Sequence, residues 1–70
     1  MTTLNILTNE GIDATASVEA GRHGGDALVI RDGYEGQTLL AVKVEHVSDV
    51  VLSSLLDPGT VTTVRETFGL

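Results

Sequence analysis

The residues best able to do chemistry in this 70-residue chain lie together at positions 21–26. This segment, Gly-Arg-His-Gly-Gly-Asp, combines a possible general base in His23, a carboxylate in Asp26 and a cation in Arg22. Glycine-rich loops bind phosphate when a helix begins directly after them, because the first N–H groups of that helix point at the anion. A strand-like pattern follows here instead, so the sequence favours a polar hairpin connection. Ligand binding or catalysis at the His23 loop is the less favoured hypothesis.

Other arrangements for metal binding or covalent catalysis are weak. The only two histidines, His23 and His46, lie far apart and lack the short spacing of a helical metal site. Cysteine is absent, which excludes thiolate ligands, thiol nucleophiles and disulfide bonds. No serine has the Gly-x-Ser-x-Gly context that exposes the nucleophile of many hydrolases. We therefore predict no catalytic residue, no metal ligand and no cofactor, and we expect that the protein is not an enzyme.

The chain is acidic, with ten Asp and Glu against four Lys and Arg and a net charge of −6. Such a surface repels nucleic-acid phosphates and anionic lipids, so we predict neither direct nucleic-acid binding nor membrane binding. It suits a protein partner with a basic surface, including the groove of a protein that handles nucleic acid. Because the charges are scattered along the chain, solubility alone also accounts for them.

No segment has the pattern of an export signal or a membrane span. The first ten residues have no basic residue ahead of the apolar ones, unlike a secretory signal. No run of consecutive apolar residues is longer than four, as at 39–42, whereas a membrane-spanning helix needs about 20. We expect a cytoplasmic protein.

Turn residues divide the chain at short intervals, as in β-rich domains. We predict strands at 3–8, 12–20, 26–31 and 37–47, joined by turns rich in Gly, Asn and Asp. The clearest is 12–20, in which apolar and polar residues alternate with a strict period of two. Its apolar residues are mostly alanine, which allows either close approach of an opposing layer or tight barrel curvature.

The period changes after the fourth predicted strand, in which we place His46 on the inward face. Ser48 is a good N-cap and helical spacing follows it, so we predict one short helix near 48–56. Asp57-Pro58-Gly59 is expected to end this helix, and the β-branched residues of 60–68 predict a last strand.

The predicted fold is one domain, 1–70, of the α+β class and mostly β, with the order β-β-β-β-α-β. A five-stranded antiparallel sheet and an SH3-like barrel both fit this order. A core of this size is marginal, and disulfides are excluded. We therefore expect added stability from a protein partner, or from a homodimer or higher oligomer formed through strand edges or a helix face.

The predicted function is non-catalytic protein binding. The only aromatic rings, Tyr34 and Phe68, leave no stacking platform for nucleic acid or for proline-rich peptides. Tyr34 lies in a loop, where its ring either is exposed and anchors an interface or folds back over the sheet edge. One specific form is a stoichiometric inhibitor of the phage type, whose anionic surface mimics nucleic acid; the alternative is a structural subunit of a homo-oligomer. The predicted partner-binding residues are Tyr34 and five acidic residues: Asp13, Glu19, Asp32, Glu35 and Glu45.

Overall fold

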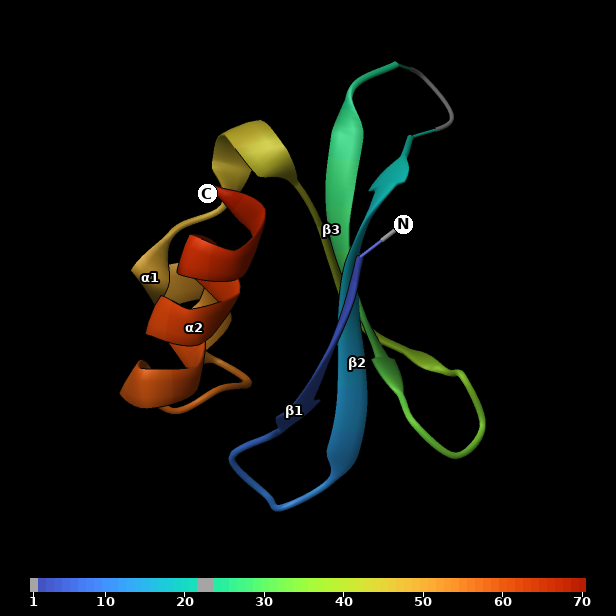
Figure 1. Ribbon diagram of the computed structural model, residues 1–70, viewed down its shortest axis with the longest axis vertical. Helices are drawn as coiled ribbons and strands as arrows, with labels where there is room; N and C mark the ends of the chain where they lie inside the picture. Colours follow the sequence, from blue (N-terminus) through green and yellow to red (C-terminus); the bar gives the residue numbers. More distant parts are fainter. Residues whose placement is uncertain (1, 22–23) are drawn as a thin grey trace.

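A computed structural model describes residues 2–21 and 24–70 (Figure 1). The elements of this described part are β1 (Thr3–Leu7), β2 (Asp13–Ala20), β3 (Asp26–Asp32), β4 (Thr38–Lys43), the 3-10 turn η1 (Val44–His46), α1 (Asp49–Ser53) and α2 (Pro58–Phe68). The strands form an antiparallel sheet in the order β1-β2-β3-β4. Both helices pack on one face of this sheet (Figure 1). We call the opposite face, on which no described helix lies, the open face.

The helix-covered face of the sheet forms the hydrophobic core. In β2, Ala14 and Ala16 are buried, and the register sets Ala16 opposite Ile30 of β3. The helices contribute three buried side chains to the same cluster, Leu52, Val61 and Val64, and the connection between the helices contributes Leu56. The small side chains of β2 therefore allow close approach of a helical layer, which is one of the two outcomes expected from the alternating pattern.

The α+β, mostly-β class is confirmed, whereas the SH3-like barrel and the fifth strand are not. The first three predicted strands agree with β1, β2 and β3 within one residue at each end. In the described part of the chain β1 and β4 are the two edges of the sheet and do not pair, so the sheet is open. The prediction of a last strand at 60–68 is wrong, because this segment lies in α2.

α2 is helical because its two ends are well capped. The Asp57 side chain accepts a hydrogen bond from the Thr60 N–H, with 2.8 Å between Oδ1 and N. Pro58 occupies the first turn, where its missing N–H costs nothing. At the other end Gly69 adopts the left-handed conformation, φ 68°, that commonly ends helices. The Asp57-Pro58 pair therefore begins α2, although the sequence analysis expected it only to end α1.

The segment between the sheet and α1 also differs in part from the prediction. The fourth strand, expected at 37–47, ends earlier as β4, and the chain continues through η1. The prediction that His46 faces inward is therefore wrong, since its side chain is 71% exposed. A helix near 48–56 is confirmed as the shorter α1. Ser48 is its N-cap, and the Ser48 Oγ accepts a hydrogen bond from the Val51 N–H at 3.2 Å.

Candidate functional site

Tyr34, in the turn between β3 and β4, presents an aromatic ring that is 80% exposed. Its backbone N–H donates to Oδ1 of Asp32 at 2.7 Å, and its Oη donates to Oδ2 of Asp13 at 3.2 Å. The Gly33 N–H donates to the Asp13 carbonyl at 2.9 Å, which ties the turn to the start of β2. The exposed tyrosine is therefore held both at its backbone and at its hydroxyl group.

The sequence forms this turn because each position has a suitable residue. An aspartate such as Asp32 commonly accepts a hydrogen bond from the N–H two residues on, which nucleates a tight turn. Gly36 has φ 73°, a left-handed conformation that glycine adopts without strain. The Gly36 N–H also donates to the Asp32 carbonyl at 3.0 Å. Local hydrogen bonds thus shape the turn, the two bonds to Asp13 tie it to β2, and Tyr34 projects away from the core.

Leu7, at the end of β1, extends the exposed surface next to this turn. The register pairs Leu7 with Asp13, and side chains of paired residues lie on the same face of a sheet. Leu7 is 53% exposed on the open face. Asp13 therefore lies between two exposed apolar side chains, those of Leu7 and Tyr34. Leu7 is not among the predicted partner-binding residues. Its signal in the sequence is alternation, because Leu4 and Ile6 face the core and the side chain of Leu7 must then lie on the opposite face.

Four of the six predicted partner-binding residues come together at this end of the sheet: Asp13, Asp32, Tyr34 and Glu35. Glu35 follows Tyr34 in the turn and is exposed. None of these three carboxylates forms an ion pair with any residue in 2–21 or 24–70. With Leu7 added, we call these five residues the tyrosine-turn surface. It combines uncompensated negative charge with two exposed apolar side chains.

Glu19 lies on the open face near the opposite end of β2 from Asp13, so it is not part of this surface, and Arg31 also neutralises it. The two side chains form a bidentate ion pair, with 3.0 Å between Arg31 Nη2 and Glu19 Oε1, and the Ser17 hydroxyl donates to Glu19 Oε2 at 3.0 Å. These hydrogen bonds, that of Arg31 first, hold the pKa of Glu19 below its ordinary value of 4.5. The register sets Glu19 and Arg31 on either side of the Ser17–Val29 pair. The ion pair thus covers Ser17 and Val29, which are each only 7% exposed.

Glu45, the sixth predicted residue, lies at the opposite end of the sheet from the tyrosine-turn surface. It belongs to η1, which follows the end of β4, whereas the Tyr34 turn precedes the start of β4. Its side chain is 69% exposed, and its Oε1 is 3.8 Å from Nε2 of His46. Glu45 therefore adds no charge to the surface around Tyr34.

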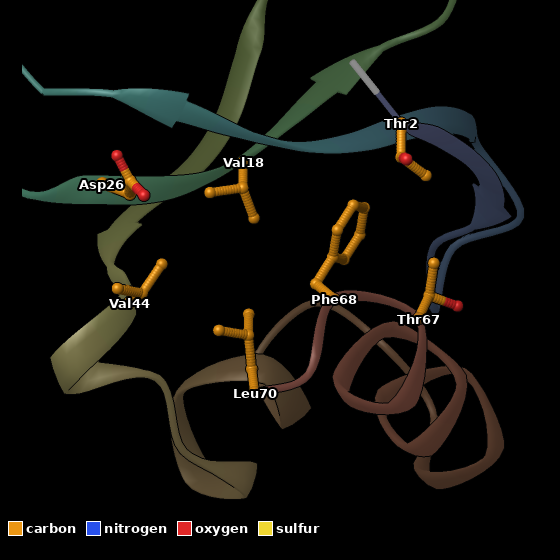
Figure 2. Close-up of a pocket in the computed structure, with 7 residues that line it drawn as sticks. All are labelled: Thr2, Val18, Asp26, Val44, Thr67, Phe68 and Leu70. Atoms are coloured by element: carbon orange, nitrogen blue, oxygen red, sulfur yellow. The ribbon is translucent and has the colours of Figure 1, made fainter.

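A groove of about 420 Å³ opens between the sheet and the C-terminal end of α2 (Figure 2). Figure 2 shows the Phe68 ring directed toward β2, with Val18, Val44 and Leu70 around the same space. Asp26 is the one carboxylate among the described residues that line it. A single carboxylate beside two threonines and four apolar side chains does not provide the acid–base pair that most hydrolytic chemistry requires.

Comparison with known proteins identifies no relative. No family model matches the chain, and neither a curated protein nor a solved structure matches it significantly.

The hypothesis of a ligand site at the His23 loop falls partly outside the described residues, since Arg22 and His23 are not among them. Asp26, the third residue of that hypothesis, begins β3. Within 2–21 and 24–70, no three His, Cys, Asp or Glu side chains are grouped so that they could hold a metal ion. In the same part of the chain, no helix has the length and apolar character needed to cross a membrane.

Proposed function

We propose that this protein is a non-catalytic binding module whose tyrosine-turn surface docks onto a protein partner with a basic surface. The observation that carries this proposal is the fixed, exposed ring of Tyr34. Tyrosine is enriched among the residues that dominate binding energies at interfaces. A tyrosine whose backbone N–H and hydroxyl group already donate hydrogen bonds loses little further conformational freedom when a partner binds.

The residues around Tyr34 indicate the chemistry of the partner. A Lys or Arg side chain fits the space beside Asp13, because its cationic head can pair with the carboxylate while its methylene stem contacts Leu7. The tyrosine ring offers a cation–π contact to the same head group. Asp32 and Glu35 add negative charge that accelerates association with a basic surface.

A more specific form of this proposal is stoichiometric inhibition of a nucleic-acid-handling protein. Grooves that bind nucleic acid are lined with Lys and Arg, and an acidic protein domain can occupy such a groove in place of phosphates. The net charge of −6 supports this form, and so do the carboxylates near Tyr34, which form no ion pair within 2–21 and 24–70. A cytoplasmic location, predicted from the sequence, belongs to the same proposal.

The test is affinity capture with matched variants. Immobilised wild-type chain, Tyr34→Ala and Val50→Ala are each exposed to lysate of the source cell at physiological salt. Val50 is the control because it is 84% exposed but lies on α1, away from the tyrosine-turn surface. We expect a partner that wild type and Val50→Ala retain equally. Tyr34→Ala should lower the affinity about 30-fold or more, the loss typical of an interface hot spot.

The charged part of the surface is tested with the captured partner. Asp13→Asn should bind the partner more weakly than wild type does. Raising the salt concentration should also weaken wild-type binding, because the attraction is electrostatic. If binding is inhibitory, the partner should lose its nucleic acid when one equivalent of wild-type chain is added. The proposal fails if no protein is retained, or if Tyr34→Ala retains the partner as well as wild type does.

A further inference from the structure

The two edges of the sheet differ in how well they are protected against pairing with another strand. β4 ends in Lys43 and pairs with β3 across a register irregularity between Ile30 and Arg31. A charged residue and a bulge are both common ways of blocking an edge. β1, with the sequence Thr-Leu-Asn-Ile-Leu, has no charge, no proline and no glycine, and its register with β2 is regular. β1 is therefore the unprotected edge.

The direction of the free hydrogen-bonding groups of β1 follows from its pairing with β2. The Thr8 N–H donates to the Ile12 carbonyl at 3.0 Å, which continues the β1–β2 register by one pair. Hydrogen-bonded and non-hydrogen-bonded pairs alternate along an antiparallel ladder. Leu4 and Ile6 therefore direct their N–H and C=O groups toward β2. The remaining residues of β1 direct theirs toward the free edge: Thr3, Asn5 and Leu7.

These outward groups are arranged so that the strand complements itself. When a second β1 is placed antiparallel about a twofold axis at Asn5, Asn5 lies opposite Asn5 of the second copy. Thr3 then lies opposite Leu7 of the second copy, so all outward N–H and C=O groups find partners. In the same register Leu4 lies beside Ile6 of the second copy, which extends the helix-covered apolar face across the axis.

The distribution of charge favours a second copy at this edge. Two molecules of charge −6 repel each other across most of their surfaces. β1 is uncharged, and so are its neighbours Thr2 and Thr67, which line the groove at the same edge (Figure 2). Pairing of two five-residue strands buries less than the roughly 1,600 Å² of a standard stable interface. We therefore expect a dimer whose population rises with concentration.

We propose that two copies of this chain associate through antiparallel pairing of their β1 strands about an axis at Asn5. The two four-stranded sheets then form one continuous sheet, with all helices on one side and both open faces on the other. Each copy keeps its tyrosine-turn surface, and the twofold axis sets the two surfaces at opposite ends of the shared open face. The dimer thus presents two separate binding surfaces in the same direction.

The test places charges on the proposed axis. Asn5→Lys and Asn5→Asp each bring two like charges together in the dimer, so each variant alone should dissociate with a Kd at least tenfold above that of wild type. An equimolar mixture of the two variants should dimerise again, because opposite charges then meet at the axis. Sedimentation velocity at protein concentrations from roughly 10 μM to 1 mM, which span the Kd expected for a small interface, measures the dimerisation of wild type, of each variant and of their mixture.

Matched controls separate this proposal from general effects of charge and from the proposed function. Ala41 is exposed in the middle of β4, so Ala41→Lys and Ala41→Asp introduce the same charges at the other edge and should leave the Kd unchanged. Tyr34→Ala should dimerise like wild type, even where it no longer captures a partner.

Any one of four results would overturn the proposal. The first is a wild-type chain that stays monomeric at the highest concentration. The second is a dimer that tolerates charge at Asn5 but not at Ala41, and the third is a mixture of the two Asn5 variants that stays monomeric. If β1 amides of a monomeric chain gain hydrogen-exchange protection only when a foreign protein binds, the edge belongs to that protein and the proposal is wrong.

Discussion

The two faces of the sheet protect their buried residues in different ways. On the helix-covered face, Leu28 and Ile30 are completely buried by the side chains of α1 and α2. On the open face, Val29 is buried almost as well, although the ion pair of Glu19 and Arg31 rather than an apolar layer covers it. Neighbouring residues of one strand therefore depend on two different interactions. The covered face holds the fold together, and the open face has polar groups available for binding.

The two faces should differ most in the free energy of unfolding that is lost when neighbouring residues of β3 are truncated. Ile30→Ala should lower the free energy of unfolding by about 2–5 kcal/mol, because it leaves a cavity in a close-packed core. Val29→Ala should cost about 1 kcal/mol, since the removed methyl groups lie under a solvated ion pair. Urea denaturation followed by circular dichroism measures both values.

A second variant keeps this comparison measurable if Ile30→Ala does not fold. A domain of this size has a total stability of only several kcal/mol, so the larger truncation can exceed it. Ile30→Val should cost about 0.5–1.5 kcal/mol and preserve the fold. Equal losses for Val29→Ala and Ile30→Ala would show that the open face is packed as closely as the covered one.

The next prediction concerns the helical layer, which covers one face of the sheet and not the other. Asp57→Ala removes the N-cap of α2 and should lower the midpoint of thermal unfolding by roughly 3–8 °C. Asp57→Asn should cost much less, because asparagine caps helices as well as aspartate does. If both substitutions cost the same, the negative charge of Asp57 and not its hydrogen bond to Thr60 stabilises the helix.

The same residue shows where sequence-based prediction reaches its limit. Strands were predictable because burial on one side imposes a period of two, as in 12–20. Residues 60–68 were assigned to a strand because β-branched residues favour strands in general. In the folded chain, the Asp57 cap and the packing of Val61 and Val64 against the sheet outweigh that preference. Capping was visible in the sequence, whereas the packing depends on the tertiary structure.

The candidate site was predictable to a similar extent. The turn residues placed Tyr34 in a loop but left open whether its ring is exposed or folds back over the sheet edge, whereas alternation placed Asp13 on the wet side of its strand. The neutralisation of Glu19 was not predictable, because Arg31 is twelve residues away and meets it only through the β2–β3 register. The contribution of Leu7 likewise depends on its pairing with Asp13. Which side chains share a surface is decided by strand pairing, and local patterns do not contain that information.

The smallest predicted effect concerns the ion pair that covers the open face. The pKa of Glu19 is lowered in the folded chain, first by the hydrogen bond from Arg31, so the folded state binds this proton less readily than the unfolded state does. Its stabilising contribution is therefore present above the ordinary pKa of 4.5 and is lost as the pH falls through the lowered pKa. Arg31 stays protonated throughout this range and does not change the sign.

Glu19→Gln removes this titration and leaves Asp57, whose pKa is also lowered, to titrate in both proteins. At pH 6–7 the free energy of unfolding, measured with urea, should be higher for wild type than for Glu19→Gln. This difference should be smaller than the free energy lost in Asp57→Ala. The values for wild type and Glu19→Gln should converge as the pH falls toward about 3. If wild type remains more stable than Glu19→Gln at the lowest pH, the charge of Glu19 is not what keeps its side chain packed over Val29. The side chain then acts by packing alone, and the two faces of the sheet are stabilised in the same way after all.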